Sequence, residues 1–159
     1  MHGDLKLQRF IPHEELDRRT LRRNILAHPS QYTFTEHAAQ AAKIVAAGGR
    51  VGLGAHGQLQ GLGVHWELWS FAAGGMSPHD VLRVGTILSA EAIGHGRNFG
   101  SIEPGKFADL QVLDANPLDD IRNTTSIRYV MKNGRLYSAE TMDEIWPRER
   151  KLERQWWWN

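Results

Sequence analysis

A glycine-rich segment near the middle of the chain carries the side chains best suited to chemistry. Residues 56–69 read His-Gly-Gln-Leu-Gln-Gly-Leu-Gly-Val-His-Trp-Glu-Leu-Trp and follow the short apolar run Arg50–Ala55. This run follows a helix-like stretch at 36–46 and the pair Gly48-Gly49. Together they predict a short buried strand of the parallel α/β type at 50–55. His56 would then stand at the carboxyl end of a strand, where α/β barrels place catalytic groups.

His56 is therefore our candidate catalytic residue. Histidine exchanges protons near neutral pH and also binds metals as a neutral imidazole. The competing interpretation is a histidine that is hydrogen-bonded within a loop, and the sequence favours neither.

Gln58, Gln60 and His65 are the candidate substrate-binding residues. If the glycine-rich segment crosses the mouth of a site, their side chains could orient a carbonyl substrate. The alternative is that they satisfy backbone groups of their own loop, which is the commoner fate of such side chains. Trp66 and Trp69, three residues apart, are expected to pack in the core.

Composition excludes several classes of function. The 159 residues (18.0 kDa) are the size of one domain, and 41% hydrophobic against 23% charged residues argue against disorder. A net charge of +1 gives no support for a nucleic-acid partner, and the absence of cysteine rules out disulfides and thiolate sites. No apolar run approaches the roughly 18 residues of a membrane span. Neither a phosphate-binding loop nor a serine nucleophile motif is present.

Periodicity and punctuation predict the elements that must position these side chains. Ser77 and Pro78 are typical of the N-cap and first residue of a helix, and Asn133-Gly134 of a tight hairpin. We expect helices at 12–26, 36–46, from 64 onward, at 78–93 and between 139 and 146, and strands at 50–55, 108–113, 127–131 and 136–137. The three tryptophans at 156–158 either pack on something or form an unusual exposed end.

The last third of the chain contains a specific motif. Residues 100–118 read Gly-Ser-Ile-Glu-Pro-Gly-Lys-Phe-Ala-Asp-Leu-Gln-Val-Leu-Asp-Ala-Asn-Pro-Leu, and residues 130–137 form the expected hairpin. Both resemble the carboxyl-terminal signature of the amidohydrolase superfamily. Residues 56–68 resemble the segment that follows the last barrel strand in its imidazolonepropionase-like subgroup. The resemblance extends from about residue 10 to about residue 150.

The resemblance implies an α/β fold class, made of the last α/β units of a TIM-type (β/α)8 barrel and the carboxyl-terminal strands of a small β-sandwich. Residues 1–99 would belong to the barrel, residues 100–146 to the sandwich strands and hairpin, and residues 147–159 to a charged, Trp-rich tail. A complete barrel needs roughly 250 residues. We therefore expect either a fragment that lacks its amino-terminal half or a short relative that needs a partner, such as a second copy.

The activity implied by the resemblance is metal-dependent hydrolysis of a C–N bond in a small amide, cyclic amide or dipeptide-like molecule. Zinc is the expected metal, but none of the eight histidines forms the H-x-H pair of the family, so no ligand set is visible. The family usually has an aspartate where His56 stands, which leaves the role of His56 open. The alternative is a non-catalytic α/β module that self-associates. Residues 1–6 do not resemble a signal peptide, so the compartment stays open between cytoplasm and, for a longer precursor, periplasm.

Overall fold

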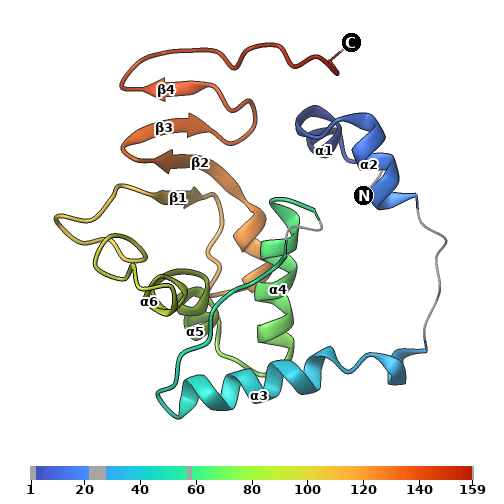
Figure 1. The fold of residues 1–159 in the computed structure, drawn as a ribbon, viewed down its shortest axis with the longest axis vertical. Coiled ribbons are helices and arrows are strands. Elements are labelled where there is room, and N and C mark those ends of the chain that lie inside the picture. The colour runs from blue at the N-terminus through green and yellow to red at the C-terminus, as the bar shows by residue number, and fades with distance from the viewer. Residues whose placement is uncertain (1–2, 22–27, 57–58, 159) are drawn as a thin grey trace.

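The protein consists of a helical part and a small antiparallel sheet (Figure 1). The structure, a computed structural model, describes residues 3–21, 28–56 and 59–158. The helices are α1 (Leu5–Phe10), α2 (His13–Thr20), α3 (Phe34–Ala46), α4 (Leu62–Ala73), α5 (Pro78–Arg83) and α6 (Ser89–Ala92), and the strands are β1 (Leu110–Leu113), β2 (Ile127–Lys132), β3 (Arg135–Ser138) and β4 (Glu144–Trp146). Short 3₁₀ turns occupy Pro29–Gln31 and Ile121–Thr125. None of the described helices is long and apolar enough to cross a membrane.

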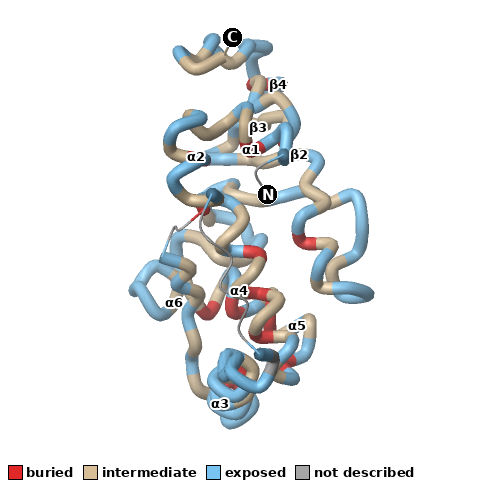
Figure 2. The backbone as a smooth tube through the Cα atoms, turned by 90° about the vertical axis from the view of Figure 1, so that its right-hand side faces the viewer, coloured by how far each residue is buried: buried red, intermediate tan, exposed pale blue. Residues whose placement is uncertain are grey.

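The hydrophobic core lies among α3, α4 and α5, and Figure 2 shows most of the buried residues there, whereas Glu144 is the one buried residue within the four strands. Its buried members are Ala38, Val45, Leu68, Phe71, Met76, Val81, Val84 and Leu88. Trp69 packs against this cluster as expected, and its indole N–H donates to the carbonyl of Ile121 (3.1 Å). The helices at 36–46 and after residue 64 are confirmed, and each begins two residues earlier than predicted.

The helix predicted at 78–93 is confirmed together with its cap. The hydroxyl of Ser77 accepts a hydrogen bond from the backbone N–H of Asp80 (3.1 Å), and Pro78 is the first helical residue. Between α5 and α6 the chain forms a π-helical segment, Val84–Leu88, so the helix is continuous but wider at this point. The hydroxyl of Ser89 donates to the carbonyl of Val84 (2.6 Å), one of the groups that such a segment displaces.

The four strands form one antiparallel sheet in the order β1-β2-β3-β4. Asn133 (φ 48°) and Gly134 (φ 75°) make the tight turn predicted between β2 and β3. The carboxylate of Asp109 accepts from the backbone N–H of Asn133 (2.6 Å) and forms an ion pair with Lys132. These contacts lower the pKa of Asp109, with Lys132 as the main cause, and they give this residue of the signature motif a structural role.

The helix predicted between 139 and 146 is wrong, because residues 144–146 form β4. The backbone N–H of Ser138 donates to the carbonyl of Asp143 (3.0 Å), which turns the chain back along β3. Tyr137 then pairs with Glu144 and Leu136 with Trp146. An apolar segment beside an open sheet edge gains backbone hydrogen bonds there, and this tertiary gain exceeds the local helical preference.

The amino-terminal helix agrees with its prediction in part. The helix expected at 12–26 is confirmed over α2 (His13–Thr20), with Pro12 as its N-cap rather than its first residue, whereas α1 precedes that range and was not predicted. Residues 22–26 of the prediction lie outside the described part of the chain. The indoles of Trp157 and Trp158 donate to the carbonyl of Arg9, so the last part of the tail packs on α1.

The run predicted as a buried strand, residues 50–55, is extended but pairs with no strand in the described ranges. Its exposure alternates as in a strand: Val51 and Leu53 face the core, whereas Gly52 and Gly54 are exposed. The only sheet among the described residues is antiparallel, so the expected parallel pairing is not formed here. A strand needs neighbours for its ladder, and the described residues offer this run none.

Candidate functional site

Residues 50–56, called here the His56 segment, are held in place by side chains instead of neighbouring strands. The backbone N–H of Leu53 donates to the hydroxyl of Ser89 (2.8 Å). The backbone N–H of Gly54 donates to both carboxylate oxygens of Glu67, at 3.1 and 3.0 Å. Glu67 lies on α4 and Ser89 opens α6, so two helices fix one extended segment. A hydrogen bond to a charged acceptor is stronger than a neutral one, which makes Glu67 the firmer of the two supports.

His56 directly follows these supports and is exposed to solvent. Its backbone adopts a φ of 52°, in the left-handed region that non-glycine residues rarely occupy. Such conformations concentrate at functional sites, where the surrounding structure maintains them. His56 thus follows a segment held by two helices and is open to solvent.

The other candidate residues do not share one environment. Gln60 is exposed, and Gln58 lies outside the described residues. His65 is only 8% exposed within α4, and its Nδ1 atom has no hydrogen-bond partner among the described residues. Burial lowers the pKa of His65 below its ordinary value, because the charged imidazolium loses its hydration there.

Acidification is expected to destabilise the protein through His65. The unfolded chain binds a proton at this residue near pH 6.5, whereas the folded chain resists it, so stability falls as the pH drops below about 6.5. The loss is at most about 1.4 kcal/mol per pH unit. Urea unfolding between about pH 5 and pH 7.5 measures it.

His65→Leu should remove most of this pH dependence, since leucine keeps the volume but cannot titrate. His37→Ala is the control, because His37 is exposed on α3. A His65→Leu protein that loses stability on acidification as steeply as the original would contradict the assignment.

The described residues do not form a complete metal site. No group of three or more His, Cys, Asp or Glu side chains among them is placed to hold a metal ion. A zinc site needs at least three protein ligands. His56 could be one of them, but the described residues do not place two more beside it. We therefore assign no chemical step to a metal in this chain.

Glu67 and Ser89 are the supporting residues that the sequence did not reveal. From the sequence, Glu67 is a surface residue beside two tryptophans, and Ser89 is one polar residue in an apolar helix. A polar residue on the buried side of a helix is a usable signal, since such groups seek a partner. Nothing local specifies that Ser89 accepts from the amide of Leu53, 36 residues away, or that Glu67 accepts from the amide of Gly54, 13 residues away.

Most of the chain, including the His56 segment, matches a known protein family. The model of the amidohydrolase family matches residues 13–137, which include the His56 segment, α2 to α6, β1, β2 and most of β3. The chain belongs to the amidohydrolase family. The resemblance found in the motif at 100–118 and in the hairpin is thereby confirmed.

Individual amidohydrolases are similar to part of this chain. An imidazolonepropionase from Shouchella clausii (strain KSM-K16) is 39% identical over 64 residues, which is 38% of this chain and 14% of that protein. A Xaa-Pro dipeptidase crystallised with methionine in its active site aligns with a TM-score of 0.57 and 27% identity, over 64% of this chain and 25% of that one. A Bifidobacterium longum protein assigned as a prolidase aligns with a TM-score of 0.56 and 32% identity, over 70% of this chain and 26% of that one. The chain thus spans about a quarter or less of these amidohydrolases.

Proposed function

We propose that this chain supplies part of the active site of a metal-dependent hydrolase that cleaves a C–N bond in a small amide, cyclic amide or dipeptide-like substrate. The observation that carries this proposal is the amidohydrolase match over residues 13–137. The similar imidazolonepropionase, dipeptidase and prolidase support hydrolysis as the class of reaction.

His56 is the residue that we assign to proton transfer. It is exposed at the end of a segment held by Glu67 and Ser89, and an imidazole can both accept and donate a proton near neutral pH. Gln58, Gln60 and His65 remain the proposed substrate-binding residues. Gln60 is the first of these to test, because it is exposed and its amide could orient a substrate carbonyl.

The proposed metal is a divalent ion, with zinc as the first candidate. The described residues lack a complete ligand set, so we place the remaining ligands in protein that this chain does not span or in an associated copy. In the same proposal, residues 1–99 form part of a (β/α)8 barrel, residues 100–146 part of a β-sandwich, and residues 147–159 a tail. The unpaired residues 50–55 support this assignment, since an extended, alternately buried segment suits a strand at the open side of an incomplete barrel.

Zinc content, molar mass and hydrolysis, measured together on the purified chain, test this proposal. Mass spectrometry gives the metal, light scattering the mass, and amides, cyclic amides and dipeptides serve as substrates. We expect hydrolysis to accompany a zinc-loaded assembly and His56→Ala to lower kcat by about 10²-fold or more. His37→Ala is the matched control, because it removes another exposed histidine.

Two results would contradict the proposal. One is hydrolysis that His56→Ala leaves unchanged. The other is a zinc-loaded chain that hydrolyses none of these substrates. A folded, zinc-free and inactive chain would exclude hydrolysis by this chain alone and would favour a non-catalytic α/β module that self-associates. In that case the light-scattering mass would also distinguish a self-associating module from a monomer.

A further inference from the structure

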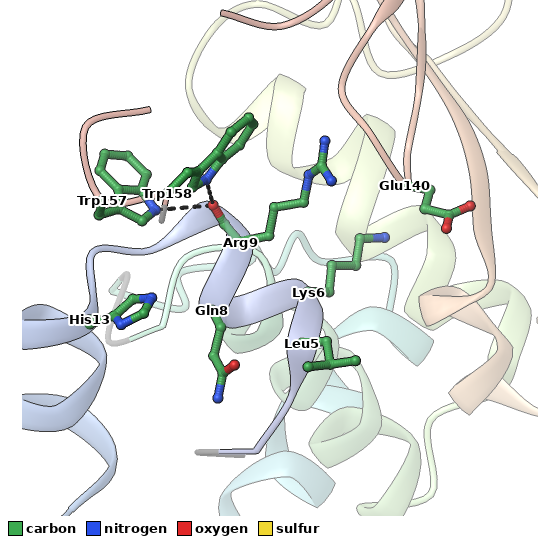
Figure 3. A pocket seen from close by; sticks show the side chains of 8 residues that line it. All are labelled: Leu5, Lys6, Gln8, Arg9, His13, Glu140, Trp157 and Trp158. Atoms are coloured by element: carbon green, nitrogen blue, oxygen red, sulfur yellow. Dashed lines mark hydrogen bonds between the residues drawn. The ribbon is translucent and has the colours of Figure 1, made fainter. Parts of the chain in front are cut away.

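A pocket of about 600 Å³ lies between α1 and the carboxyl-terminal tail, and none of the candidate site residues lines it. Its walls include Leu5, Lys6, Arg9, Glu140, Trp157 and Trp158 (Figure 3). These residues come from three regions of the chain: the first described helix, the turn after β3 and the last described residues. The amidohydrolase match ends at residue 137, so the Trp-rich wall lies outside it.

The tryptophan wall is fixed through the end of α1. The carbonyl of Arg9 lies in the last turn of the helix and accepts the indole N–H of Trp157 (3.1 Å) and that of Trp158. Helix carbonyls at this position lack an intrahelical partner, so the two indoles supply one. Because each indole uses its single polar atom in this contact, the rest of each ring offers apolar surface.

The polar side of the pocket comes from two cations on one face of α1. Lys6 and Arg9 are three residues apart, and in Figure 3 their side chains extend toward the side of the pocket where Glu140 lies. The guanidinium of Arg9 stands 4.7 Å from the ring centre of Trp158. In the described ranges neither Lys6 nor Arg9 forms an ion pair with a carboxylate. Two cations beside apolar ring surface attract an anion that also has an apolar part.

We propose that this pocket binds a small carboxylic acid with an aromatic or branched apolar body. The carboxylate would lie between Lys6 and Arg9, with the body against Trp157 and Leu5. Guanidinium and ammonium groups are the usual partners of carboxylates, and indoles provide rigid contact area for an apolar group. Glu140 at the same pocket repels a second negative charge, so a monoanion fits better than a phosphate or a dicarboxylate.

Calorimetric titration with 3-phenylpropionate tests this inference. Two comparison probes separate its parts: 3-phenylpropan-1-ol has the ring without the charge, and acetate has the charge without the ring. We expect 3-phenylpropionate to bind about tenfold more tightly than either. Equal affinity for the alcohol or for acetate would overturn the proposal, as would no heat of binding at about 10 mM probe.

Charge variants locate the site. Lys6→Gln should weaken 3-phenylpropionate about fivefold, and Glu140→Gln should strengthen it about twofold, because one variant removes an attracting and the other a repelling charge. Lys43→Gln is the matched control, since Lys43 is an exposed lysine on α3 and outside the pocket. Lys6→Arg should restore most of the affinity. Equal weakening by Lys6→Gln and Lys43→Gln would show a general charge effect and overturn the site.

Discussion

Replacing Gly100 with alanine is expected to destabilise the protein by about 3–4 kcal/mol. Gly100 has a φ of +99°, and a Cβ atom there would lie 2.7 Å from the Cβ of Ala90 and 2.9 Å from the Cα of Ile87. The second neighbour is backbone of the π-helical segment, which cannot move aside as a flexible side chain can. Strain and overpacking therefore add at this position.

Gly105→Ala is the matched control for Gly100→Ala. Gly105 belongs to the same motif and has a similar φ of +92°, but nothing lies within 4 Å of its missing Cβ. It should show the conformational cost alone, about 1 kcal/mol. Guanidinium unfolding of both variants measures the difference. Similar losses in the two variants would contradict the close contact between Gly100 and the helix.

Replacing Gly74 with alanine is expected to cost about 2–3 kcal/mol for a different reason. The backbone of Gly74 is not strained, but its Cβ would lie 2.5 Å from the Cβ of Ala38 and 2.6 Å from the N of Ala39. Ala38 is buried, and the end of α4 approaches α3 closely here (Figure 1). The two helices would have to separate, which loosens the core around them.

Gly52→Ala is the control for this variant. Its Cβ would meet the Cβ of Ala92 and the hydroxyl of Ser89 at 3.8 Å, which is ordinary contact distance. Alanine also restricts the unfolded chain, so we expect a change within about 0.5 kcal/mol. Thermal unfolding of both variants provides the comparison. If Gly74→Ala melted at the temperature of the unchanged protein, the close approach of α3 and α4 would be refuted.

Elements with strong local signals could be predicted from the sequence. Ser77 and Pro78 begin their helix, and Asn133-Gly134 turns between two strands, because capping and turn preferences act within a few residues. The strand at residues 144–146 could not be predicted, since it forms by pairing with the edge of β3. The apolar run at 50–55 predicted a buried strand, which is not formed, because pairing requires a neighbour that no local pattern specifies.

The candidate site was predictable only in part. The sequence predicts His56 at the end of a buried strand, whereas in the structure His56 follows residues 50–55, which form no strand. The burial of His65 depends on how α4 packs, and the supports given by Glu67 and Ser89 depend on contacts between distant residues. The roles of His56, His65 and the two glutamines remain predictions.

The contact between the tail and α1 has a consequence for the order of folding. Trp158 and Arg9 are 149 residues apart, so their hydrogen bond joins nearly opposite ends of the chain. Contacts of such long sequence separation form slowly, because a large loop must close first. During synthesis, the tail cannot donate a hydrogen bond to the carbonyl of Arg9 until Trp157 has left the ribosome. Helix α1 and the pocket beside it are thus expected to be among the last parts of the protein to become ordered.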